Sequence, residues 1–301
     1  MKAPLEAERV PVAHYRVDNG EDFDLRRFAT AVTANYRDLS DYRQRMEAYR
    51  RSIRQWQRKL FADGQRGLLV VVQGMDAAGK NGLIRRVMGG VDPAGLHVWS
   101  FGPPTSKELR QDFMRRYHQY LPEYGEIAVF NRSYYEFALS ARIHPEWLEA
   151  RGIEAGNAKR TAFWQQVYET IQAFEHYLLD NGIYVVKLMP HVSEQVQRQR
   201  LLDRLHTEHK RWKLSEADCN DVRRWNDLAE AYAACIQGTA TARSPWYVLP
   251  GDDKRTTRLL AAEAVLQALE NMAPQWPDGL DGDNANKRAR IAAILNGESK
   301  R

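Results

Sequence analysis

The feature that most constrains the fold is a glycine-rich loop directly after a short apolar run. The run covers residues 68–72, and the loop, residues 74–82, reads GMDAAGKNG. A buried strand that enters such a turn and leaves it as a helix forms a phosphate-binding loop, because glycines let backbone N–H groups converge on an anion. Lys80 adds a fixed positive charge. We expect the phosphates to contact Gly74, Met75, Ala77, Ala78, Gly79, Lys80 and Asn81.

This loop departs from the usual pattern at one position. Asn81 stands where Ser or Thr normally helps to hold Mg²⁺, so the metal needs another ligand. Asp76 lies among the phosphate-binding amides and would repel a phosphate unless a cation lay between them. We therefore predict that Asp76 binds the metal. The alternative is that it only favours the positive end of the following helix.

The composition is that of a folded and mildly basic chain. Of the 301 residues 44% are apolar and 28% are charged, and the net charge is +5. This charge is compatible with an anionic partner but does not choose between nucleotide, polyphosphate, nucleic acid and membrane surface. No apolar run approaches the roughly 18 residues that cross a bilayer, and the start is no secretory signal. Cys219 and Cys235 indicate neither a disulfide framework nor a metal site. We predict a cytoplasmic protein.

Five short apolar stretches are typical of buried strands, and helical patterns separate them. They are residues 68–73, 96–101, 126–130, 183–189 and 246–249. This alternation predicts an α/β fold with a five-stranded parallel sheet covered by helices on both faces, in three layers. Ligands of such sheets bind beyond the carboxyl ends of the strands, where the glycine-rich loop lies.

A long amphipathic helix is predicted before the sheet. Its apolar residues recur at spacings of three and four from Leu39 to Leu60, and arginines fill the other faces. The aromatic residues lie on the apolar stripe, so packing in the core or against another subunit is favoured over nucleic-acid binding. We predict an N-terminal extension (residues 1–35), one folded domain (36–272) and a polar tail (273–301) with a short helix at 287–295.

The densest charge cluster follows the fourth predicted strand. Residues 198–213 hold six Lys or Arg residues against two acids. We predict a helical lid over about residues 198–216 that closes cations over phosphates. The alternative is a solvated helix face. The cations expected to bind are Arg200, Arg204, Lys210, Arg211 and Lys213.

A third motif, FNRSYYE, ends the third predicted strand. Asn131 stands where an acid usually binds metal, and it can orient a water or a phosphate. Arg132 would face the same crevice and is a natural ligand for phosphate oxygens. Glu136 supplies the nearest carboxylate, about one helical turn later. Together with Asp76 and Lys80, these three are the predicted catalytic residues.

These motifs resemble those of the polyphosphate kinase 2 family. GMDAAGKNG resembles the family's phosphate loop and FNRSYYE its second motif, while KRWKL is similar to its lid and SPWYVLPGDDK to its last-strand segment. The likeness covers about residues 36–272. It implies a P-loop kinase-like fold and phosphoryl transfer between inorganic polyphosphate and adenine or guanine nucleotides, with Mg²⁺ or alternatively Mn²⁺.

The resemblance also implies a role for each motif. Lys80 would bind phosphates, Asp76 would hold metal or position the acceptor, and Arg132 would contact the transferring group. The lid cations would grip the polyphosphate chain. Asn131 followed by Glu136 looks like the subgroup that phosphorylates both nucleoside mono- and diphosphates, although Tyr134 stands where that subgroup often has His.

The expected reaction is a direct in-line transfer without a covalent phosphoenzyme. We predict a homo-oligomer, a dimer or tetramer, with no membrane contact and with nucleic acid disfavoured as a partner. Two alternatives stay open. One is an ATP-dependent nucleoside monophosphate or small-metabolite kinase, and the other is a nucleic-acid-binding or switch protein whose affinity would fall steeply with salt.

Overall fold

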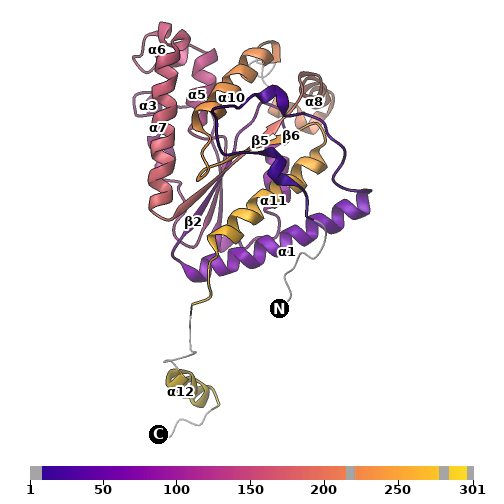
Figure 1. Cartoon of the computed structure of the whole chain (residues 1–301), viewed down its shortest axis with the longest axis vertical. Helices are drawn as coiled ribbons and strands as arrows, with labels where there is room; N and C mark the ends of the chain where they lie inside the picture. The colour runs from indigo at the N-terminus through magenta and orange to yellow at the C-terminus, as the bar shows by residue number, and fades with distance from the viewer. Residues whose placement is uncertain (1–8, 215–219, 221, 278–284, 297–301) are drawn as a thin grey trace.

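A six-stranded sheet forms the centre of the computed structural model, which describes residues 9–214, 220, 222–277 and 285–296 (Figure 1). In order across the sheet the strands are β1 (Arg16–Val17), β6 (Trp246–Pro250), β5 (Ile183–His191), β2 (Gly67–Val72), β4 (Ile127–Asn131) and β3 (Leu96–Ser100). All pairs are parallel except β1 with β6. Since β2 lies between β5 and β4, the glycine-rich loop leaves the middle of the sheet.

The five predicted parallel strands are confirmed, each within two residues of its expected bounds. The predicted count of five was wrong, because β1 adds a sixth, antiparallel strand at one edge. Arg16 pairs with Tyr247, and Val17 with Trp246. Part of the predicted N-terminal extension therefore belongs to the sheet.

Helices cover both faces of the sheet, as predicted (Figure 1). One face carries α1 (Leu39–Asp63), α2 (Lys80–Val87) and α11 (Lys254–Met272), and the other carries α5 (Tyr135–Ile143), α7 (Thr161–Asp180) and α10 (Trp225–Thr239). The side chains of β2 alternate between the two layers. Leu68, Val70 and Val72 pack with the first set, whereas Leu69 and Val71 pack with the second. Burial on both faces explains why the strand is a continuous apolar run.

The long helix α1 packs its apolar stripe along α11. Asp38 caps its start by accepting hydrogen bonds from two backbone N–H groups, and left-handed Gly64 ends it. The buried members of the stripe are Tyr42, Met46, Tyr49, Ile53 and Leu60. The prediction of core packing for this helix is therefore confirmed.

Shorter helices make up the rest of the helical structure in the described residues. They are α3 (Ser106–Leu109), α4 (Arg115–His118), α6 (Glu146–Glu149), α8 (Glu194–His206) and α12 (Ala285–Leu295), together with the 3-10 turns η1 (Val12–Tyr15), η2 (Leu25–Arg27), η3 (Pro93–Gly95), η4 (Ala155–Lys159) and η5 (Glu208–Lys213). The short helix predicted in the tail corresponds to α12. Across the described residues, no helix has the length and apolar character that a membrane span requires.

Candidate active site

The glycine-rich loop connects β2 to α2 as predicted, and its turn uses left-handed backbone. Gly79 caps α2 with φ of 103°, a conformation that glycine adopts without strain. Ala77 also has a positive φ, 58°, which is unusual for a residue with a side chain. Strained backbone of this kind collects at functional sites. The N–H groups in the first turn of a helix are suited to binding an anion, so this geometry is compatible with the predicted phosphate site.

Lys80 lies inside this loop and is buried. Its Nζ donates hydrogen bonds to the carbonyl oxygens of Gly74 (2.6 Å) and Met75 (3.0 Å), and it lies 3.9 Å from Oδ1 of Asp76. Burial and the nearby charge of Arg132 lower the pKa of Lys80 to about 8. A phosphate bound in the loop would favour the charged lysine.

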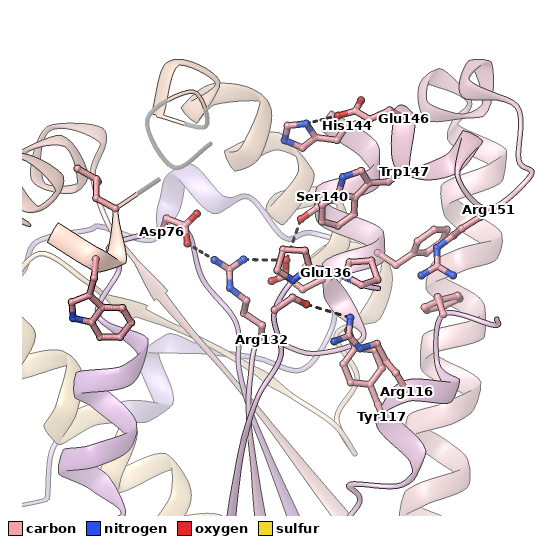
Figure 2. Close-up of a pocket in the computed structure, with 17 residues that line it drawn as sticks. Asp76, Arg116, Tyr117, Arg132, Glu136, Ser140, His144, Glu146, Trp147 and Arg151 are labelled. Carbon is pink, nitrogen blue, oxygen red and sulfur yellow. Dashed lines mark hydrogen bonds and ion pairs between the residues drawn. The ribbon is translucent and has the colours of Figure 1, made fainter. Parts of the chain in front are cut away.

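Arg132 lies between two carboxylates from different elements (Figure 2). Its guanidinium donates to Asp76 of the glycine-rich loop and, at 3.2 Å, to Glu136 in the first turn of α5. The charge of Glu136 raises the pKa of Arg132 above its ordinary value. The three side chains form one row of alternating charge.

The backbone of Arg132 is also in the left-handed region, with φ of 65°. Its N–H donates to the carbonyl oxygen of Val72 at 3.1 Å, so the ends of β4 and β2 are tied together. A non-glycine residue in this conformation costs about 1 kcal/mol. This backbone directs the guanidinium toward both carboxylates (Figure 2).

Further hydrogen bonds hold Glu136 and Asn131 in place. Gln73 Nε2 donates to Glu136 at 2.5 Å, and Ser140 Oγ donates to the same carboxylate at 3.1 Å. Asn131 Nδ2 donates to Asn81 Oδ1 at 2.9 Å. Within the described residues, the buried Oδ1 of Asn131 has no hydrogen-bond partner. The structure thus brings the five predicted catalytic residues to one end of the sheet.

A cavity of about 600 Å³ opens beside this row (Figure 2). Its lining includes Asp76, Arg132, Glu136 and Ser140, the rings of Phe113, Tyr117, Phe137 and Trp147, and the cations Arg116 and Arg151. The guanidinium of Arg151 lies 5.2 Å from the ring centroid of Phe137, and that of Arg116 lies 5.5 Å from the ring centroid of Tyr117. Flat apolar walls and two arginines suit an aromatic molecule that carries negative charge.

Comparison with known proteins identifies the family. The profile of the family Polyphosphate kinase 2 (PPK2) matches residues 36–277. The chain belongs to the polyphosphate kinase 2 family. This membership confirms the resemblance seen in the motifs and the predicted enzyme class, a polyphosphate kinase.

Three relatives illustrate the similarity. An ADP-polyphosphate phosphotransferase of Rhodopseudomonas palustris is 36% identical over 270 residues, which cover 90% of this chain and 93% of that protein. An AMP/ADP-polyphosphate phosphotransferase of Meiothermus ruber is 38% identical over 264 residues, 87% and 94% of the two chains. The crystal structure of polyphosphate kinase 2 from Arthrobacter aurescens TC1 matches with a TM-score of 0.83 at 32% identity and covers 96% of this chain and 98% of that one.

Arg200, one of the predicted lid cations of this polyphosphate kinase 2 member, has an unexpected position. It is buried, and its guanidinium donates hydrogen bonds to four backbone carbonyls. Two belong to the glycine-rich loop, Ala77 (3.2 Å) and Ala78 (3.1 Å), and two follow β6, Gly251 (2.7 Å) and Asp252 (3.0 Å). Arg200 therefore braces the loop, unlike a lid cation that faces solvent.

The other predicted lid cations lie on α8 and η5. Arg204 is half-buried one turn after Arg200. Arg211 is exposed, and its Nε donates to the carbonyl oxygen of Leu205 at 2.9 Å. The side chains of Lys210 and Lys213, and the last two residues of the predicted lid, lie outside the described part of the chain.

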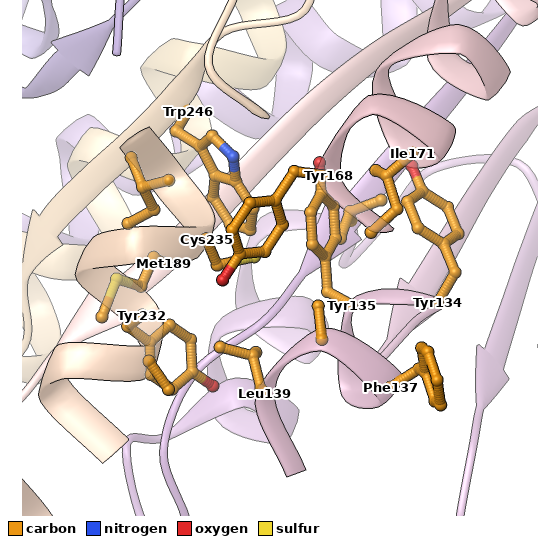
Figure 3. Close-up of a cluster of buried hydrophobic side chains, with 14 of the residues drawn as sticks. Tyr134, Tyr135, Phe137, Leu139, Tyr168, Ile171, Met189, Tyr232, Cys235 and Trp246 are labelled. Atoms are coloured by element: carbon orange, nitrogen blue, oxygen red, sulfur yellow. The ribbon is translucent and has the colours of Figure 1, made fainter. Parts of the chain in front are cut away.

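The FNRSYYE motif also reaches into the core (Figure 3). Tyr134 and Tyr135 are fully buried, and their hydroxyls donate to Oε1 of Glu175 at 2.8 and 2.7 Å. Oε2 of the same carboxylate accepts from Lys187 Nζ at 2.7 Å and from Ser244 Oγ at 2.6 Å. Tyr134 thus anchors the motif and does not line the cavity.

The donor set at the site fits a magnesium ion bound together with substrate. In the described ranges, no three His, Cys, Asp or Glu side chains gather into a ready-made metal cage. Mg²⁺ is usually held by one or two carboxylates plus substrate phosphates and waters. Asp76 and Glu136 supply carboxylates, and Oδ1 of Asn131 is an acceptor suited to a metal-bound water.

Proposed function

We propose that this protein transfers phosphoryl groups reversibly between inorganic polyphosphate and the nucleotides AMP and ADP. Family membership and the names of the two phosphotransferase relatives support this reaction. The observation that carries the proposal is the row Asp76–Arg132–Glu136. It lies between a phosphate-binding loop and a cavity of nucleotide size, so one guanidinium can reach the phosphates of both substrates.

In this arrangement polyphosphate and the nucleotide bind on opposite sides of Arg132. The terminal phosphates of polyphosphate bind the glycine-rich loop and Lys80. The nucleotide enters the cavity, where its base lies among the aromatic walls and its phosphates point toward Arg132. Arg132 exchanges its bonds with the two carboxylates for bonds with phosphate oxygens, which it can bind bidentately.

The chemistry is a direct displacement. A phosphate oxygen of the nucleotide attacks the terminal phosphorus of polyphosphate, and the P–O bond to the next phosphate breaks. The shortened chain leaves with the electron pair of that bond. The attacking oxygen is ionised near neutral pH, so no general base is required. The protein contributes positioning and positive charge around the oxygens in transfer.

Mg²⁺, or Mn²⁺ in its place, would be held by Asp76 with help from Glu136. When bound, the ion neutralises charge between two anionic substrates that otherwise repel each other. Asn131 is uncharged, so it adds no repulsion toward the extra phosphate of ADP. This supports the use of both AMP and ADP.

Three further expectations remain predictions. They are the use of guanine nucleotides, action in the cytoplasm, and assembly into a dimer or tetramer. Most of the apolar stripe of α1, which favoured self-association, is buried by the chain itself, and those buried residues do not argue for a second subunit.

The test is incubation of the protein with Mg²⁺, polyphosphate and either AMP or ADP, followed by measurement of the ADP and ATP formed. We expect ATP from both acceptors. ATP from ADP alone would contradict the dual use of acceptors, and no product from either would overturn the proposed reaction. A phosphohistidine detected during a single turnover would overturn direct transfer.

A further inference from the structure

A second hollow lies beside the glycine-rich loop, between α8 and the start of α11. Its volume is about 380 Å³. The charged residues that line it are Arg200, Asp203, Asp252, Asp253, Lys254, Arg255 and Arg258. The four cations exceed the three acids, and no sequence motif drew attention to Arg258.

The three carboxylates of this hollow are engaged in local hydrogen bonds. Asp252 accepts from the backbone N–H of Ser193 at 2.9 Å. Asp253 caps α11 by accepting from N–H groups in its first turn. Asp203 accepts from Gln199 Nε2 at 2.9 Å. These hydrogen bonds fix the three carboxylates to neighbouring parts of the chain, and none of the three pairs with Arg258.

Two guanidiniums in this region have no partner among the described residues. Arg258 lines the hollow, and Arg204 lies on α8 one helical turn after Arg200 but does not line it. Both side chains are half-buried, and neither guanidinium makes a hydrogen bond or ion pair with any described residue. Partly buried cations without an anionic partner are unfavourable, and a bound anion would stabilise them.

Arg258 lies close to the N-terminal end of α2. Its Nη2 is 3.2 Å from the position that a Cβ would take on Gly82, in the first turn of that helix. Arg204 lies on α8 one helical turn after Arg200, whose guanidinium bonds to the glycine-rich loop. Arg200 forms the wall between the loop and the hollow, since it bonds to carbonyls on both sides.

We propose that Arg258 and Arg204 bind the phosphates of the polyphosphate chain that follow those held by the glycine-rich loop. The hollow is then a donor subsite that makes affinity depend on chain length. This inference rests on the proposed function. It assigns Arg258, which lies outside the predicted lid, to the recognition of the donor.

The test compares Arg258→Gln with the wild type over a series of polyphosphates of defined length, with AMP as acceptor. Arg58→Gln is the matched control. This substitution removes the same charge from an exposed position near the end of α1. That end of α1 contacts Gly125, which precedes β4, so it lies at the end of the sheet opposite the glycine-rich loop. Arg258→Lys retains the charge and tests whether the positive charge alone accounts for the affinity for long chains.

We expect the KM ratio of Arg258→Gln to wild type to be near one for the shortest chains and to rise to about tenfold for long ones, the loss of one charge-assisted contact. The KM for AMP stays unchanged, Arg58→Gln matches the wild type, and Arg258→Lys retains most of the affinity for long chains. A ratio that is the same at every length, or an equal effect of Arg58→Gln, would overturn the subsite while leaving the reaction intact. A wild type without activity on any polyphosphate would overturn the proposed function and this subsite with it.

Discussion

Residues 131–136 contribute to two charged clusters that are built in opposite ways. The proposed catalytic cluster, Asp76, Arg132 and Glu136, is partly open, with exposed side-chain fractions of 17%, 34% and 16%. The buried cluster consists of Glu175, Lys187, Tyr134 and Tyr135, and in it Glu175 and Lys187 are 1% and 0% exposed.

The difference follows from what each cluster has to do. Each oxygen of Glu175 accepts two hydrogen bonds, so the carboxylate is saturated and has no reason to change partners. Arg132 lines a cavity, and in the proposed reaction phosphate oxygens replace its bonds to the two carboxylates. Side chains that are proposed to exchange hydrogen-bond partners with substrate are accessible, whereas side chains that stabilise the fold are buried. Mutations in the first cluster should therefore lower kcat, and mutations in the second should lower the free energy of unfolding.

The largest effect is expected for Arg132→Gln. It removes the guanidinium proposed to contact both substrates, and we expect kcat to fall about a thousandfold, as for other arginines that stabilise transferring phosphoryl groups. The free energy of unfolding should change little, because the side chain is partly exposed. Initial rates and denaturant unfolding measure the two quantities. A kcat within a few-fold of wild type would contradict the role given to Arg132.

The next effect is expected for Glu175→Gln, which leaves Lys187 buried without its counter-charge. The free energy of unfolding should fall by about 3 kcal/mol, while kcat of the folded enzyme stays near the wild-type value. Denaturant unfolding measures the loss. The double variant Glu175→Gln/Lys187→Met is the control, and it should recover part of the stability because both charges are removed. A large loss of kcat in a stable variant would show that the two clusters are not separate.

A smaller effect concerns pH. The pKa of Lys80 is lowered to about 8, so the free enzyme loses this charge as the pH rises through that value. We expect kcat/KM for polyphosphate to fall above pH 8, by about tenfold for each further pH unit. In Lys80→Arg the charge persists, and the alkaline decline should disappear. The shapes of the two profiles are compared. A wild-type profile that stays level well above pH 8 would contradict the assignment.

The smallest effect is expected for Tyr134→Phe. It removes one of four hydrogen bonds to Glu175, and the free energy of unfolding should fall by about 1 kcal/mol. Because Tyr134 does not line the cavity, kcat should stay close to that of wild type. Tyr135→Phe serves as a parallel variant in the same cluster. A kcat loss for Tyr134→Phe alone would mean that this hydroxyl acts in the reaction.

The sequence predicted those parts of the fold and site that have a local pattern. Apolar runs located the five parallel strands, and two short motifs located the residues that meet at the carboxyl ends of β2 and β4. The edge strand β1 was missed because two residues in a polar segment have no periodicity. Their strand conformation comes from pairing with β6, more than 200 positions later.

The site features that the sequence did not predict depend on distant contacts. Arg200 belongs to a basic run, and nothing local indicates that it turns inward to brace the glycine-rich loop. Tyr134 finds its partner Glu175 about 40 residues away. Arg116 and Arg151 line the cavity from segments without a recognisable motif, so only the folded chain reveals them.

The left-handed backbone of Arg132 has a consequence for how such a protein evolves. Glycine would relax this position, because it carries no Cβ. Selection for folding alone would therefore favour Gly at residue 132, and only selection for turnover would retain Arg. In populations grown without selection for the reaction, Arg132 should be replaced early. The variants with Gly at this position should unfold at a higher temperature than the active ancestor.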